Sequence, residues 1–185
     1  FALVLGRVSN RDDVVFGTVL FGRMQSGEGA DRALGMFINT LPVRVRLNEQ
    51  SVLDSLRSTH ALLAELMRHE HAPLSLAQRC SAIPSPAPLF GALFNYRHIV
   101  GADAGEVQKR TSVGAGIESL GAEERTNYPF TVSIDDLGDA ISLTIQAQSP
   151  AEPGNVHAYL CKALEELVTA LESDPVRPLE TIDVL

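Results

Sequence analysis

The feature that most constrains this chain is the apolar run from Val14 to Phe21, which reads VVFGTVLF. Thr18 is its only polar side chain. A nearly continuous run of this kind is typical of a strand with both faces buried. We therefore expect Val14–Phe21 to form a central strand of a sheet that other elements cover.

A second strand is predicted in GMFINTLPVRVRL, residues 35–47, but its interior is unusual. The second half alternates Val and Leu with arginine, as a half-buried strand does. Asn39, Thr40 and Pro42 interrupt the apolar pattern, and a buried amide without hydrogen-bond partners costs roughly 1–3 kcal/mol. Asn39 and Thr40 are therefore either satisfied in a turn or bulge, or they face something other than core. Pro42 is expected to end strand pairing at a sheet edge.

Helical spacing marks three further segments. The chain opens in a helix that we expect to end at Ser9–Asn10. Ser51 and Asp54 form a capping-box-like start for a long helix, and Pro153 opens the last one. The apolar stripes predicted to pack inward are Val52, Leu56, Leu63 and Leu66–Met67 in the long helix, and Val156, Leu160, Leu164, Leu167 and Leu171 in the last.

The remaining strands complete a mixed pattern. GALFNYRH predicts a third strand, and YPFTVSID with AISLTIQAQ predicts a hairpin across the turn DDLGD. Residues 22–32 and 101–127 are polar and rich in small residues, so we expect loops there. The order of elements indicates an α/β (α+β) sandwich, a mixed sheet with flanking helices.

Composition excludes some functions. The chain has 185 residues, 45% of them hydrophobic, which is enough for one domain with a sizeable core. Its formal net charge of -8 argues against nucleic acid binding. The longest apolar run is about nine residues, far short of the roughly 18 that a membrane span requires.

Two cysteines, Cys80 and Cys161, lie in no metal-binding or disulfide spacing. We expect free thiols in a reducing, cytoplasmic setting. The first residue is Phe1, and the opening helix has no cap before it. This start predicts that the chain is cut from a longer protein.

Catalytic motifs are absent from the sequence: it contains no G-x-S-x-G elbow, no H-E-x-x-H and no P-loop. His69 and His71 are the nearest to a metal pair. Because they end a helix, where residues two apart point in different directions, we interpret them as a helix end that complements the helix dipole.

Several segments together resemble the C-terminal lobe of a condensation domain of a nonribosomal peptide synthetase. They are DDVVFGTVLFGR, LGMFINTLPVRVRL, HEHAPL, PLFGALFNYRH, TNYPFTVSID and ESDPVRPLETIDVL, which follow the family's order and cover essentially residues 1–185. GMFINTLPVR is the most specific, because it supplies the family's Gly, aromatic, Asn-Thr and Arg as Gly35, Phe37, Asn39, Thr40 and Arg44.

The resemblance implies a lobe similar to chloramphenicol acetyltransferase and a tunnel between two such lobes. Carrier-bound donor and acceptor thioesters enter that tunnel, and the family's His-His-x-x-x-Asp-Gly motif belongs to the other lobe; this sequence contains no such motif. The chain alone is therefore expected to be inactive. The substrate-binding residues that the resemblance implies are Gly22, Arg23, Phe37, Asn39, Thr40 and Arg44, with no catalytic residue and no metal.

The implied partners are the N-terminal lobe of the same domain, peptidyl carrier protein domains and an adjacent adenylation domain. No cofactor is expected to bind the chain directly, since phosphopantetheine is attached to the carrier domains. Two other functions stay open: a CoA-dependent acyltransferase of related fold, and a catalytically silent scaffold lobe. In the tunnel interpretation Asn39 serves a substrate amide, and Arg44 either pairs with a neighbouring loop or is solvated.

Overall fold

A computed structural model describes residues 1–22, 34–47, 50–84, 86–98 and 125–185. The expected loops at 22–32 and 101–127 lie largely outside these residues. The strands are β1 Asp13–Leu20, β2 Asn39–Arg46, β3 Ala92–His98, β4 Phe130–Asp136 and β5 Ile141–Ala147. The helices are α1 Ala2–Ser9, α2 Val52–Met67, α3 Leu74–Cys80, α5 Pro153–Ser173 and the short η2 Leu179–Thr181.

The five strands form one mixed sheet in the order β2-β1-β3-β4-β5. β1, β3 and β4 run parallel to one another, while β2 and β5 pair antiparallel at the two edges. The β4–β5 hairpin turns at Gly138, whose φ of 92° favours glycine, and the Asp136 carboxylate accepts the Gly138 N–H. The predicted fold class, a mixed sheet with flanking helices, is confirmed.

β1 is an interior strand, as predicted, but only one of its faces is fully buried. Val14 and Phe16 lie in the main core, whereas Val15 on the opposite face is 37% exposed. Phe90 covers that second face at Gly17, where a Cβ atom would lie 2.3 Å from the Phe90 ring. The expectation of burial on both faces was wrong at Val15, because the helices of the core cluster pack against the other face.

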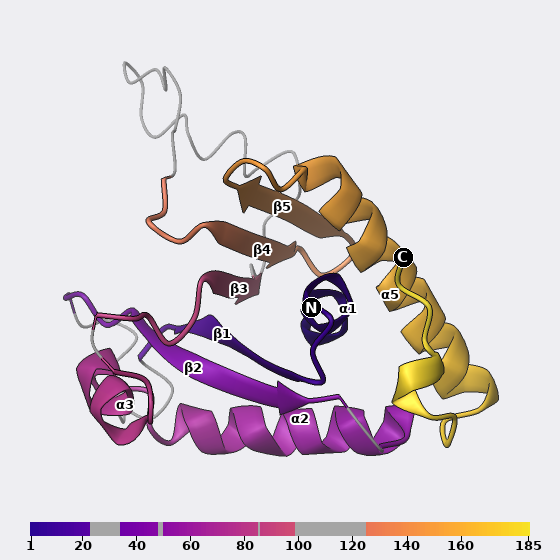
Figure 1. The fold of residues 1–185 in the computed structure, drawn as a ribbon, viewed down its shortest axis with the longest axis horizontal. Coiled ribbons are helices and arrows are strands. Elements are labelled where there is room, and N and C mark those ends of the chain that lie inside the picture. The colour runs from indigo at the N-terminus through magenta and orange to yellow at the C-terminus, as the bar shows by residue number, and fades with distance from the viewer. Residues whose placement is uncertain (23–33, 48–49, 85, 99–124) are drawn as a thin grey trace.

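The main core lies between the sheet and helices α1 and α5 (Figure 1). The ring of Phe1, which is partly buried against this core, contacts three other rings: its centroid is 4.9 Å from that of Phe16, 5.4 Å from Phe94 and 5.9 Å from Phe130. Aromatic contacts at these separations add stability beyond burial alone. Phe1, the residue before α1, thus packs the start of this helix against β1, β3 and β4.

Both long helices begin where the sequence predicted. The Ser51 hydroxyl accepts the Asp54 N–H at 3.1 Å, and Pro153 occupies the first turn of α5. The predicted stripes were partly wrong: Leu56 is 53% and Leu164 58% exposed. In α5 Ala163 and Ala170 are buried. The predicted Leu160, Leu167 and Leu171 pack against the core beside them, so in this stripe Leu164 is the leucine that was wrong. In α2 only the first turns are buried.

The tail, residues 174–185, is a structural part of this fold. The Val52 N–H donates to Arg177 O and the Leu53 N–H to Pro175 O, so tail carbonyls satisfy the free N–H groups at the start of α2. Leu179, Ile182 and Val184 are buried in the core cluster. The tail therefore connects α2 to the rest of the fold.

β2 begins at Asn39 and pairs with β1 without a break to Arg46. Pro42 lies within the ladder opposite Gly17, so the prediction that it ends pairing was wrong; the edge position of β2 allows a residue that cannot donate on one side. Helix α3 was missed, because Pro73 and the short apolar pattern gave no clear helical period. No described helix is long and apolar enough to cross a membrane.

Candidate functional site

The site predicted from the sequence lies at one end of the sheet, where β1 stops and β2 starts. Gly22 follows β1 with φ of 67°, and a Cβ atom there would lie 2.1 Å from Phe37 O. Only glycine fits both this left-handed conformation and the close approach. Gly22 thus brings the exit of β1 against the segment that enters β2.

The Asn39 side chain connects the first residue of β2 to the segment after α2. Its Nδ2 group donates to Glu70 O at 2.8 Å and to Ala72 O at 2.7 Å, and its Oδ1 accepts the Thr40 N–H at 2.9 Å. Both amide hydrogens are therefore used within the described chain. The amide is satisfied by a turn that is distant in sequence, not by a bulge of its own strand.

Arg44 lies farther along β2, opposite Val15, whereas Asn39 lies opposite Leu20. Its guanidinium binds the Asp13 carboxylate of β1 at 2.5 and 2.9 Å and holds the pKa of that carboxyl below its usual value. Arg44 is 60% exposed, so the pair contributes little to stability. Its partner is in the neighbouring strand rather than in a loop.

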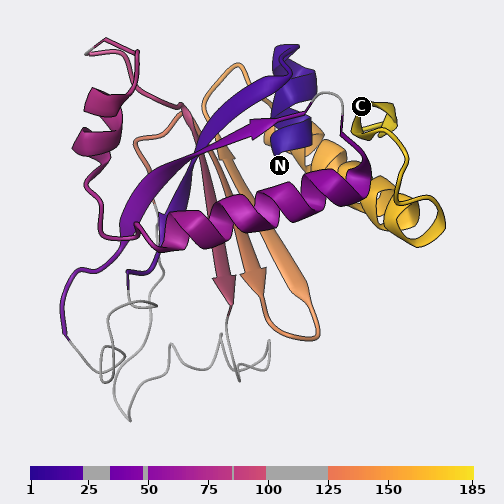
Figure 2. The same cartoon turned by 90° about the horizontal axis from the view of Figure 1, so that it is seen from below.

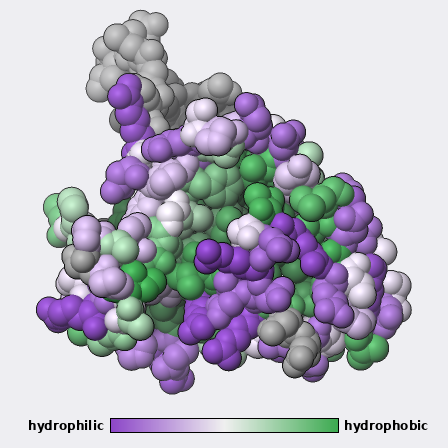
Figure 3. Space-filling view, viewed as in Figure 1, coloured by the Kyte–Doolittle hydropathy of each residue, from purple (hydrophilic) through white to green (hydrophobic). Residues whose placement is uncertain are grey.

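A hydrophobic hollow opens beside Gly22, lined by Phe21, Gly35, Met36, Phe37 and Ile38. Ile38 is 67% exposed, and Leu34 and Met36 extend fully into solvent. Figure 3 shows hydrophobic surface at the left-hand end of the molecule, where Figure 1 places the entry to β2. Such a concentration of exposed apolar side chains is typical of a binding surface.

A cluster that the sequence did not reveal lies at the ends of β3 and β4. The Asp136 carboxylate accepts the Tyr96 hydroxyl at 2.5 Å and bonds His98 Nδ1 at 2.9 Å. Together with the Gly138 N–H, the Tyr96 hydroxyl and His98 lower the pKa of Asp136 to about 2, and the Asp136 bond raises the pKa of Tyr96. On the opposite face Arg97 binds Asp135 at 2.5 and 3.0 Å.

These pairs follow from strand register. Arg97 lies directly opposite Asp135, and His98 directly opposite Asp136. The only sequence signal was that both strand segments, NYRH and SIDD, end in charged residues. Recognising it requires the parallel register, which the sequence pattern does not determine.

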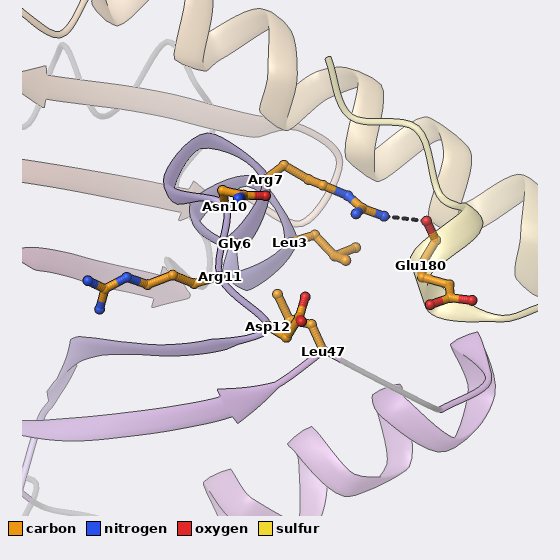
Figure 4. Close-up of a pocket in the computed structure, with 8 residues that line it drawn as sticks. All are labelled: Leu3, Gly6, Arg7, Asn10, Arg11, Asp12, Leu47 and Glu180. Atoms are coloured by element: carbon orange, nitrogen blue, oxygen red, sulfur yellow. Dashed lines mark hydrogen bonds between the residues drawn. The ribbon is translucent and has the colours of Figure 1, made fainter.

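A second hollow lies at the other end of the sheet, where α1 meets the tail (Figure 4). Leu3, Gly6 and Leu47 line it, and the Arg7 guanidinium donates to Glu180 O across it. In Figure 4 the Arg11 side chain extends away from this hollow. We interpret it as the seam between α1 and the tail, since none of the predicted site residues lies there.

His69 and His71 approach different carboxylates: His69 lies 3.5 Å from Glu65 and His71 3.7 Å from Glu70. Among the described residues, no group of three or more His, Cys, Asp and Glu side chains could hold a metal ion. Cys80 and Cys161 form no disulfide in the structure.

Of the predicted site residues, the structure brings Gly22, Phe37, Asn39 and Thr40 together at one end of the sheet. Arg44 lies apart from them, toward the start of β1. Arg23 falls outside the described residues. The structure adds the hydrophobic hollow and the Tyr96–His98–Asp136 cluster at the same end.

Comparison with known proteins gives a consistent result. The family model "Condensation domain" matches residues 1–185. Malpinin synthetase of Mortierella alpina is 49% identical over the whole chain, which spans 2% of that synthetase. The chain therefore corresponds to a small part of that synthetase.

Solved structures share the fold. One is a double mutant of the starter condensation domain of rhizomide synthetase RzmA, in complex with C8-CoA. The match covers all of this chain and 41% of that structure's chain, with a TM-score of 0.69 and 20% sequence identity. The four-domain nonribosomal peptide synthetase AB3403, bound to AMP and glycine, matches with TM-score 0.70 at 13% identity, over 15% of its length. The chain belongs to the condensation domain family of nonribosomal peptide synthetases.

Proposed function

We propose that residues 1–185 form the C-terminal lobe of a condensation domain that joins a donor acyl or peptidyl thioester to an acceptor aminoacyl thioester. The family match over the full chain carries this proposal, and the match to 41% of a complete condensation domain supports the assignment to one lobe. The double-histidine motif is absent from this sequence. The lobe's contribution is therefore binding and positioning.

In this reaction the acceptor's α-amino nitrogen attacks the donor thioester carbonyl, so a C–N bond forms and the C–S bond breaks. The donor carrier's thiol is released, and the amine loses a proton. Holding both thioesters in line accounts for much of the acceleration in such two-substrate reactions. We assign one wall of the tunnel to the end of the sheet with Gly22, Phe37, Asn39 and Thr40.

Partners follow from the same proposal. The N-terminal lobe supplies the opposite wall and the catalytic histidine, and peptidyl carrier protein domains bring both substrates on phosphopantetheine. An adenylation domain is proposed next to the tail, and the multidomain synthetase match supports this arrangement. We assign no direct substrate role to Arg44, since its guanidinium binds Asp13.

The experiment uses the longer protein that we propose to contain this chain, called the parent protein below. Its donor and acceptor carriers are loaded, and the peptide product is detected by mass spectrometry. We expect product from the parent and none above background from residues 1–185 alone. Product from the isolated chain would contradict the assignment of chemistry to the other lobe. No product from the fully loaded parent would contradict the condensation function.

A second candidate is acyl transfer from CoA, because the RzmA neighbour was solved in complex with C8-CoA. The same lobe would then line the path of an acyl-CoA donor instead of a carrier-bound one. Replacing the loaded donor carrier with acyl-CoA in the parent assay separates the two. Acylated acceptor formed with acyl-CoA alone would favour this second function.

A further inference from the structure

The two edge strands of the sheet differ in how their outer sides are protected. β2 and β5 are the last strands on either side, so each carries a row of main-chain groups that no other described strand pairs with (Figures 1 and 2). Such a row binds another extended chain unless proline, charged side chains or a bulge blocks it. The residues in the two rows show which edge is blocked.

The outer row of β2 is blocked. The Leu47 N–H donates to Asp12 O at 2.7 Å, and in an antiparallel ladder every second residue bonds the same neighbour. The odd-numbered residues of β2 therefore face β1, and the outward main-chain groups belong to Thr40, Pro42, Arg44 and Arg46. Pro42 has no N–H to donate, and both arginine side chains are exposed. This edge is protected against pairing with another strand.

The outer row of β5 has no such protection. The Leu137 N–H donates to Ala140 O at 2.9 Å. The Gln148 N–H donates to Pro129 O at the same distance, so the even-numbered residues of β5 face β4. The outward main-chain groups belong to Ile141, Leu143, Ile145 and Ala147. In the part of the chain that the structure describes, these groups form no main-chain hydrogen bond. The segment 140–149 contains no proline, glycine or charged residue.

β5 is complementary to a second copy of itself. Two such strands can run antiparallel with Thr144 opposite Thr144 of the other copy. Leu143 then lies opposite Ile145 of the other copy, and Ile141 lies opposite Ala147. This register uses the outward N–H and C=O groups of all four residues in both strands. It also sets apolar side chains against apolar ones, and Ile141, which is 66% exposed, gains a neighbour.

We infer that the outer edge of β5 pairs with β5 of a second copy of this chain, so that two five-stranded sheets join across a two-fold axis at Thr144. A second copy is favoured over an unrelated strand because every outward group of β5 finds its match in β5 itself. The contact is isologous and therefore closes as a dimer. This inference does not depend on the proposed function.

Sedimentation equilibrium of the parent protein tests this contact. Two seven-residue strands bury less than a standard interface, so association is weak and is measured from about 1 to 100 μM. We expect the weight-average mass to rise toward that of a dimer over this range. A mass that stays that of the monomer up to about 100 μM overturns the inference.

Charged variants at the two-fold axis test the contact residue by residue. Thr144 is exposed, and Thr144→Lys places two like charges directly opposite each other, so dimerisation should weaken at least about tenfold. Thr144→Glu should weaken it by a similar factor. Thr169→Lys, the same change at an exposed position of α5, is the matched control and should leave the mass unchanged. Equal effects of T144K and T169K overturn the inference.

An equimolar mixture of T144K and T144E tests the register itself. The mixture sets opposite charges across the axis, so dimers should return although each variant alone is monomeric. Their return also shows that both variants are folded. A mixture that dimerises no better than either variant alone overturns the pairing of Thr144 with its own copy.

Discussion

The two ends of the sheet are built for different purposes. At the end where β1 starts, α1, α5 and the tail enclose a core in which Val4 and Ile182 are buried. At the end where β1 stops, the β1–β3 pairing has ended at Thr18 and Phe94, and Ile38 lies exposed. The buried core is concentrated at the first end and the exposed apolar surface at the second, so this fold can expose one end of its sheet without losing its core.

The largest expected effect is at the enclosed end. Ile182→Ala removes a side chain that is 1% exposed and should lower the free energy of unfolding by roughly 2–5 kcal/mol. Val176→Ala, in the same tail but 72% exposed, is the matched control. Chemical denaturation of residues 1–185 measures both. Equal losses for the two variants would contradict the burial of Ile182 in the core at the enclosed end.

Asn39→Ala tests the contact between the start of β2 and the segment after α2. The substitution leaves Glu70 O and Ala72 O without their donors and should lower the free energy of unfolding by roughly 1–3 kcal/mol. Asn39→Asp, which keeps the size but removes both donors, should be at least as damaging. If the condensation rate of the parent instead falls ten- to a hundredfold with an unchanged melting temperature, the amide serves substrate.

Asp136→Asn sharpens the comparison at the ends of β3 and β4 through the pH dependence of stability. The pKa of Asp136 is lowered to about 2 by Tyr96, Gly138 and His98, so its stabilisation is complete above the unfolded pKa near 4 and is lost as the pH falls toward 2. The variant should therefore lose less stability than the wild type between pH 4 and pH 2. Asp139→Asn, in the same turn, is the control; an identical pH dependence of wild type and D136N would contradict this role.

Local signals predicted most of the fold. The cap at Ser51, Pro153 at the start of α5 and the β4–β5 hairpin each depend on residues close in sequence, and the structure places all three as expected. The buried stripe of α5 was displaced at Leu164, because the position of the helix on the sheet is set by tertiary packing.

The site was predicted less completely, since its contacts are long-range. Asn39 was identified as unusual, but its acceptors at Glu70 and Ala72 are 31 and 33 residues away and form no sequence pattern with it. The end of the β1–β3 pairing and the Asp136 cluster depend on strand register, which alternation alone does not determine.

The condensation rate of the parent protein with Ile38→Asp tests most directly whether the end of the sheet where β1 stops lines the substrate path. Placing a charge in the hydrophobic hollow should lower kcat/KM by roughly ten- to a hundredfold through lost apolar contact, with little change in melting temperature because Ile38 is 67% exposed. Val176→Asp, in the tail that packs at the start of α2, should leave kcat/KM within about twofold. An unchanged kcat/KM for I38D, or equal losses in the two variants, would contradict the account.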